Sequence, residues 1–145
     1  MGEFADVSVM LAVPMLMRHE GFQGMVYRDS KGILTIGYGR NLETTGVSRA
    51  EAAAMLQQDA IEARDHCASY SYFDALRNAR KAALIDLCFN VGRLRYSDFV
   101  RMHEHLKRSE WWEAGEEIVQ SKAHLQEPAR IRELATILRT GLLSR

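Results

Sequence analysis

The sequence predicts a mostly helical α+β fold, in which a small sheet-bearing N-terminal lobe is joined by a long helix to a helical C-terminal lobe. Apolar residues are spaced as in a helix from Val7 to Glu20, and short β-like runs separated by glycines follow between residues 21 and 42. Helical patterns return from residue 48 onward. The 145 residues, of which 47% are hydrophobic and 26% charged, suit one globular chain with a sizeable core.

The first segment is predicted to be a buried helix. The apolar run from Val7 to Met17 is too short to cross a bilayer. Glu3 and Asp6 precede it, at the place where an export signal would carry positive charge. We therefore expect neither a signal peptide nor stable membrane insertion. Residues 1–4 can be interpreted as a remnant of cloning.

The next segment, from Gly21 to Leu42, is predicted to form a small antiparallel sheet with β-like runs at residues 25–27 and 33–36. Ser48 and Glu51 have the spacing of a capping box and predict the start of a helix of about nineteen residues, roughly 28 Å long. Further helices are predicted over residues 78–91, 97–108, 110–120 and 128–140, with glycines 92 and 141 as stop signals.

Charge, cysteine and histidine patterns argue against several classes of protein. The 19 basic and 19 acidic residues cancel, and no dense basic stripe indicates a nucleic-acid partner. Cys67 and Cys88 lack metal-ligand spacing, and two buried reduced thiols are favoured over a disulfide. His103 and His105 are two positions apart on a predicted helix and point away from each other. We predict no metal and no cofactor.

Two acidic residues near the N-terminus suit glycoside hydrolysis, which needs one carboxyl to protonate the leaving oxygen and another to deliver water or a nucleophile. Glu20 ends an apolar helix, where partial desolvation would keep it protonated near neutral pH. Asp29 lies in the polar turn Arg28 to Gly32, where it can stay ionised. Spacing alone also fits two solvated surface acids, because a chain with 19 acidic residues offers several such pairs.

The surrounding residues resemble the phage-type lysozymes, or endolysins. The resemblance consists of a helix-ending Glu-Gly, an aspartate nine residues later, and a Thr-Ile-Gly-x-Gly strand and turn; these are Glu20-Gly21, Asp29 and residues 35–39. The resemblance extends over nearly the whole chain through residues 48–59, 89–92 and 128–141. It implies one lysozyme-like domain with a cleft between a small lobe of about residues 18–60 and a helical lobe of about residues 61–145, which also includes the N-terminal helix of about residues 7–20.

The resemblance further implies a muramidase, a glycoside hydrolase that cleaves the β-1,4 bond between N-acetylmuramic acid and N-acetylglucosamine in peptidoglycan. Glu20 would be the general acid, and Asp29 with Thr35 would position the water. A threonine hydroxyl can both donate to and accept from water. The alternative for Thr35 is a strand position that merely favours a β-branched residue.

Residues later in the chain would support this reaction. Arg130 would lie beside Glu20 as its ion-pair partner, or alternatively would be an exposed arginine in the first turn of the last helix. Asn90 and Phe89 would line the sugar cleft, where an amide can bond to acetamido and hydroxyl groups. A plain helix-terminal asparagine is the alternative for Asn90. Only residues 41–47 separate the Gly39 turn from Ser48, which implies a reduced lip and a more open cleft.

The resemblance also implies a monomer whose partner is the peptidoglycan glycan strand. It would accumulate in the host cytoplasm before lysis, depend on a holin-like permeabilising protein, and act on the cell wall from the periplasm. Two alternatives remain open. The chain could be a non-catalytic cell-wall binding module that keeps the fold, or the muramidase payload of a secretion-system effector.

Overall fold

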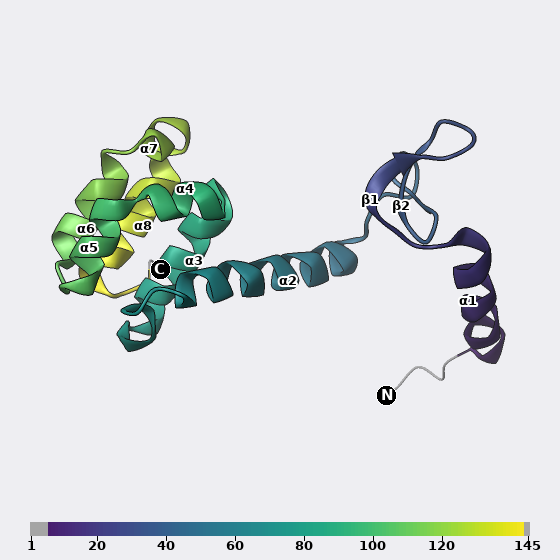
Figure 1. Ribbon diagram of the computed structural model, residues 1–145, viewed down its shortest axis with the longest axis horizontal. Coiled ribbons are helices and arrows are strands. Elements are labelled where there is room, and N and C mark those ends of the chain that lie inside the picture. The colour runs from purple at the N-terminus through teal and green to yellow at the C-terminus, as the bar shows by residue number, and fades with distance from the viewer. Residues whose placement is uncertain (1–5, 144–145) are drawn as a thin grey trace. The chain divides into compact units, whose positions relative to one another are not determined.

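The computed structural model describes residues 6–143; residues 1–5 and 144–145, and with them the proposed cloning remnant, lie outside the described part (Figure 1). Contacts within the chain divide it into an N-terminal unit, residues 1–52, and a C-terminal unit, residues 53–145. Helices predominate, and one small sheet is present, so the predicted mostly helical α+β class is confirmed.

The N-terminal unit contains a three-stranded antiparallel sheet with the strand order β1-β2-β3. The strands are β1 (Gln23–Arg28), β2 (Leu34–Gly37) and β3 (Arg40–Asn41). Thr35, in the central strand, pairs with Tyr27 on one side and Asn41 on the other. The predicted antiparallel sheet is therefore confirmed, and it has a short third strand that the apolar pattern does not indicate.

Helix α1 (Val7–Glu20) has the bounds that the sequence predicts. The Asp6 carboxylate accepts a hydrogen bond of 2.8 Å from the backbone of Ser8 and so caps the helix, which ends at Gly21 with φ 69°. None of its side chains is buried, so the predicted burial is not found within the N-terminal unit. Its assignment to the helical lobe stays a prediction. None of the helices described in residues 6–143 has the length and apolarity to cross a membrane.

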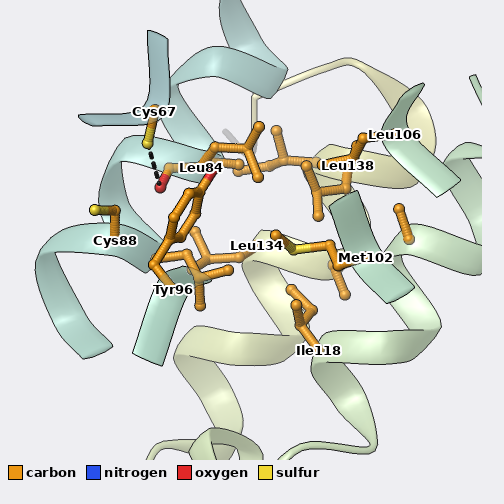
Figure 2. Close-up of a cluster of buried hydrophobic side chains, with 14 of the residues drawn as sticks. Cys67, Leu84, Cys88, Tyr96, Met102, Leu106, Ile118, Leu134 and Leu138 are labelled. Carbon is orange, nitrogen blue, oxygen red and sulfur yellow. Dashed lines mark hydrogen bonds between the residues drawn. The ribbon is translucent and has the colours of Figure 1, made fainter. Parts of the chain in front are cut away.

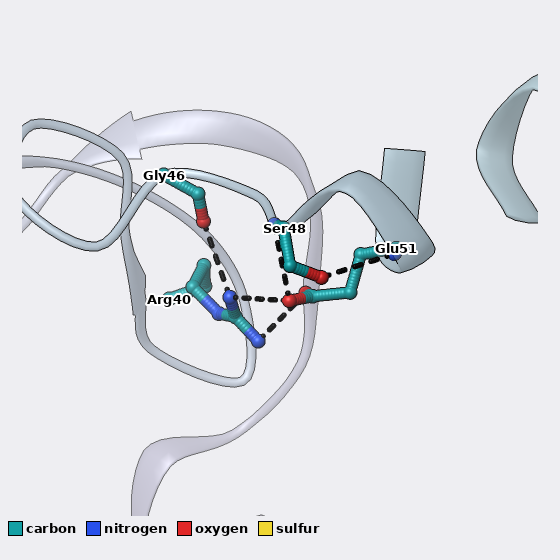
Figure 3. Close-up of polar contacts among 4 residues, drawn as sticks. All are labelled: Arg40, Gly46, Ser48 and Glu51. Carbon is teal, nitrogen blue, oxygen red and sulfur yellow. Dashed lines mark hydrogen bonds and ion pairs between the residues drawn. The ribbon is translucent and has the colours of Figure 1, made fainter. Parts of the chain in front are cut away.

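A polar cluster joins the end of the sheet to α2 (Arg49–Ala68) (Figure 3). The Glu51 backbone donates to the Ser48 hydroxyl at 3.1 Å, and the Ser48 backbone donates to Glu51 at 3.3 Å, which confirms the capping box. Arg40 donates to the Gly46 carbonyl at 3.1 Å and pairs with Glu51 at 2.8 Å. Hydrogen bonds from Ser48 and then Arg40 lower the pKa of Glu51. One arginine thus ties β3 and the following loop to the helix start.

The C-terminal unit holds the hydrophobic core (Figure 2). Its elements after α2 are the 3₁₀ turn η1 (Phe73–Ala75), α3 (Asn78–Val91), α4 (Arg93–Asp98), α5 (Val100–Lys107), α6 (Trp111–Val119), α7 (Lys122–Gln126) and α8 (Pro128–Thr140). Helix α8 packs against α3, α6 and α7. Helices α2 to α6 and helix α8 supply most of the buried side chains, which include Cys67, Leu84, Leu87, Cys88, Tyr96, Met102, Leu106, Ile118, Leu134 and Leu138.

One predicted helix of this unit is wrong. The sequence predicts a single helix over residues 97–108, but the chain breaks at Phe99 (φ −73°, ψ 53°) between α4 and α5. Tyr96 before the break and Met102 after it are both fully buried in the same core. The break lets both side chains reach the core, which helical periodicity along one segment cannot indicate. Helix α7 is also absent from the sequence prediction.

His103 lies in an aromatic cluster at the edge of this core, with only 8% of its surface exposed. Its ring stacks on Tyr70 with 4.0 Å between centroids. Nε2 lies 2.8 Å from the carbonyl of Tyr96, which can only accept, so Nε2 carries the proton of the neutral ring. Nδ1 is then the acceptor for the Tyr72 hydroxyl. Burial lowers the pKa of His103, because the imidazolium would lose its hydration.

We expect His103→Gln to remove part of the acid sensitivity of folding. Because the pKa of His103 is lowered, its ring binds fewer protons in the folded state than in the unfolded state. Its contribution to wild-type stability is therefore full above about pH 6.5 and is lost as the pH falls below that value. The variant should be less stable at pH 7.5 by about 1–3 kcal/mol, because a flexible amide does not stack on Tyr70 as the imidazole ring does and does not keep both hydrogen bonds in the same geometry. Urea unfolding at pH 7.5 and pH 5 measures both effects. An equal loss of stability on acidification in the two proteins would contradict the assignment.

Candidate active site

Glu20 is the last residue of α1, and its carboxyl group rests against the β2–β3 turn. A methyl group placed on the α-carbon of Gly39 would lie 2.7 Å from Oε2 and 3.1 Å from Cδ of Glu20. Gly39 also has φ +75°, a conformation that favours glycine. The missing side chain therefore provides the space for the carboxyl group. Glu20 is exposed, so the desolvation expected for it is not supplied by the N-terminal unit.

Asp29 follows β1, and its carboxylate organises the turn to β2. Oδ1 accepts hydrogen bonds from the backbone N–H of Lys31 at 2.8 Å and of Ile33 at 2.9 Å. The backbone N–H of Asp29 donates to the Ile33 carbonyl at 3.0 Å, and the N–H of Gly32 donates to the Asp29 carbonyl at 2.9 Å. The turn therefore holds one carboxylate oxygen in place. Across the described residues, the other oxygen accepts no hydrogen bond from the protein and is open to a ligand.

Thr35 is buried in the central strand, with 3% of its surface exposed. Its hydroxyl donates to the Ile33 carbonyl at 2.8 Å. Since that proton is already used, the oxygen can act toward a further group only as an acceptor. Ile33 connects the two polar residues, because its carbonyl accepts from Thr35 while its N–H donates to Asp29.

The three predicted catalytic residues therefore come from consecutive elements of one unit: the end of α1, the β1–β2 turn and β2. Asp29 and Thr35 are joined through Ile33, and Glu20 lies at the other end of β2, beside Gly39. Sequence reasoning treats Gly39 as a turn residue and misses its contact with Glu20. The signal that could have indicated it is the second glycine of the Thr-Ile-Gly-x-Gly motif, which has a positive φ.

Arg130 lies in the first turn of α8 and is half-buried between two carboxylates. Its Nε contacts Asp86 at 2.7 Å, and its Nη1 contacts Glu127 at 3.3 Å. The hydrogen bond to Asp86, the largest cause, raises the pKa of Arg130. The Asn90 amide donates to Glu127 at 3.3 Å. The sequence pattern indicates neither carboxylate, and the pairing of Arg130 with Glu20 stays a prediction.

A hollow of about 700 Å³ in the C-terminal unit is lined by Asn90. It runs along the ends of α3 and α4, α5, and the segment from α6 to α7. Its charged lining residues are Arg95, Asp98, Arg101, Glu117 and Lys122. Phe89, the other residue expected at the sugar cleft, is exposed on α3 but is not part of this lining.

The two cysteines belong to the core of the C-terminal unit. Cys67 and Cys88 are free thiols buried in the core, as predicted. Burial raises the pKa of Cys67 to about 12 and also raises that of Cys88, so neither forms a thiolate readily. Over residues 6–143, no three His, Cys, Asp or Glu side chains gather in a way that could hold a metal ion.

Known proteins match most of this chain. The model of the phage lysozyme family matches residues 17–126, which include Glu20, Asp29, Thr35 and Asn90. A "Probable T4-type lysozyme 2" of Dictyostelium discoideum is 23% identical over 159 residues, covering 89% of this chain and 94% of that protein. A "Probable T4-type lysozyme 1" of the same organism is 25% identical over 160 residues, covering 90% and 94%. The match to the family model extends over more than half of the chain, which therefore belongs to the phage lysozyme family.

Proposed function

We propose that this chain is an endolysin-type muramidase, which hydrolyses the β-1,4 bond between N-acetylmuramic acid and N-acetylglucosamine in bacterial peptidoglycan. Its family supports a lysozyme-type glycosidase. In the proposed reaction, Glu20 donates a proton to the leaving oxygen, while Asp29 and Thr35 position the attacking water. No metal or cofactor takes part.

The observation that carries this proposal is the setting of the two carboxyl groups in the N-terminal unit. Two backbone N–H groups hold Oδ1 of Asp29, which leaves the second oxygen free to take a proton from water. The Glu20 carboxyl group occupies a space that exists only because residue 39 is glycine. The Asp29 carboxylate is thus held in a defined position, as catalysis requires of a reacting group.

Three residues of the C-terminal unit are proposed to support the reaction. Asn90 and Phe89 are proposed to contact the sugar chain, and the position of Asn90 at a polar hollow supports its role. Arg130 is proposed as the ion-pair partner of Glu20, shared with the carboxylates of Asp86 and Glu127. The protein is proposed to act as a monomer, to accumulate in the host cytoplasm before lysis, and to reach the wall with the help of a holin-like protein.

Turbidity loss of permeabilised Gram-negative cells, combined with analysis of the new reducing ends, tests the proposed activity. A muramidase produces new reducing ends at N-acetylmuramic acid. Binding to the wall without new reducing ends would instead identify a cell-wall binding module. Activity that appears only in complex with a secreted carrier would identify the effector payload.

Glu20→Gln should fold normally but lose lysis, because an amide of the same shape cannot donate the required proton. A general acid typically contributes about 10²–10⁴-fold to the rate. The lytic rate and the far-UV circular dichroism spectrum should be compared with those of Glu43→Gln, a matched change at another exposed glutamate of the same unit. Retention of more than about a tenth of the wild-type rate would remove Glu20 as the acid.

Gly39→Ala should abolish most activity, because the new methyl group would displace the Glu20 carboxyl group. Gly37→Ala is the matched control, since Gly37 also has a positive φ of +69° but has nothing within 4 Å of the position that its methyl group would occupy. Both variants carry a backbone strain of about 1–2 kcal/mol. Only Gly39→Ala should lose about 10²-fold or more in rate, the usual effect of a misplacement of about 1 Å. Equal rates in the two variants would show that the contact with Glu20 is unimportant.

Hydrolysis is expected to invert the anomeric configuration and to release the α-anomer first. If Asp29 acts as a base on water, the two carboxyl groups must lie roughly 6.5–9.5 Å apart, whereas a covalent nucleophile requires about 5–5.5 Å. The Thr35 oxygen, free only to accept, suits a water that donates one proton to it and the other to Asp29. NMR of fresh product before mutarotation measures the anomer. An initial β-anomer, or a trapped glycosyl-Asp29 adduct, would overturn the mechanism.

A further inference from the structure

Two exposed aromatic rings lie on the two chain segments that meet at the Glu20 carboxyl group. Phe22 is 66% exposed and Tyr38 is 47% exposed. Their ring centroids are 5.3 Å apart, with 49° between the ring planes. The Phe22 ring also passes over Gly24, where a methyl group would lie 3.4 Å from Cζ. The rings therefore form one continuous apolar surface on the N-terminal unit.

The position of this aromatic pair follows from the contact between Glu20 and Gly39. Phe22 comes two residues after Glu20, and Tyr38 directly precedes Gly39, where an added methyl group would meet the Glu20 carboxyl group. A large aromatic side chain can bury about 150–250 Å², and the N-terminal unit itself leaves most of the Phe22 ring uncovered. Such a surface beside reactive polar groups is typical of ligand-binding sites.

The chemistry proposed for Glu20 restricts what can occupy this surface. A general acid must lie within about 2.6–3.2 Å of the oxygen that it protonates, measured between heavy atoms. A glycosidic oxygen joins two pyranose rings, so both sugars must lie next to Glu20 during the reaction. Each N-acetylhexosamine presents apolar C–H groups and an acetamido methyl group, which pack well on aromatic rings.

We propose that Phe22 and Tyr38 form an aromatic platform that binds an N-acetylhexosamine ring of the glycan strand beside the bond that is cleaved. This proposal rests on the proposed role of Glu20, but the platform would act in substrate binding. It contributes to holding the sugar and takes no part in proton transfer. Loss of a ring should therefore weaken substrate binding and leave the chemical step nearly unchanged.

Steady-state kinetics on soluble, uncross-linked peptidoglycan strands tests the platform. Phe22→Ala and Tyr38→Ala should each raise KM about 2–12-fold, the equivalent of one aromatic contact, with kcat changed less than about twofold. Tyr38→Phe keeps the ring and should stay within about twofold of the wild-type KM. Val47→Ala, at a 48%-exposed position of the same unit, is the control for loss of an exposed apolar side chain. Its KM should not change.

Thermal unfolding and a binding measurement separate the remaining outcomes. An unchanged KM in both alanine variants would overturn the platform, and a lowered Tm with an unchanged KM would show that the rings serve protein packing. Chitotetraose binding to the inactive Glu20→Gln protein, measured by calorimetry, does not depend on turnover. Weaker binding after Phe22→Ala in that background supports the platform even if the wild type cleaves nothing. If the wild type cleaves peptidoglycan but Phe22→Ala in the Glu20→Gln background leaves sugar binding unaltered, the platform is refuted and the proposed activity stands.

Discussion

The close approach of the Glu20 carboxyl group to Gly39 is the constraint on which the candidate active site depends. It joins the end of α1 to the β2–β3 turn, and a methyl group at residue 39 would force the Glu20 carboxyl group to move. The same contact brings Phe22 and Tyr38 together, because each lies within two residues of one of the two partners. The acid, the turn and the two rings are thus close neighbours in the N-terminal unit.

Different interactions stabilise the two units. In the C-terminal unit, each fully buried aliphatic side chain contributes about 1.5–3 kcal/mol, so the core from α2 to α8 provides most of the hydrophobic stabilisation. The N-terminal unit buries little besides Thr35 and relies on directed hydrogen bonds, such as those of Asp29 and the contacts among Arg40, Ser48 and Glu51. Directed bonds suit a unit that must hold polar groups in place while leaving them open to a ligand.

The surroundings of Arg130 show how neighbouring carboxylates hold a charge that is only half-buried. Asp86 on α3 and Glu127 just before α8 contact different nitrogen atoms of the guanidinium group, and Asn90 contacts Glu127 in turn. Arg130 is therefore largely neutralised by its neighbours and fixed in orientation. The arrangement also orients Asn90 at the edge of the polar hollow.

Local features of the sequence were sufficient to predict α1, α3, the capping box at Ser48 and the antiparallel sheet, because helical periodicity, caps and glycine turns act over a few neighbouring residues. The motif around Glu20 and Asp29 indicated the family for the same reason. Only the tertiary structure decided the break at Phe99, the contact of Glu20 with Gly39, the pairing of Arg130 with Asp86 and the exposure of the Phe22–Tyr38 pair. These features depend on which distant segments pack together, and residues far apart in the chain leave no periodic signal of their contact.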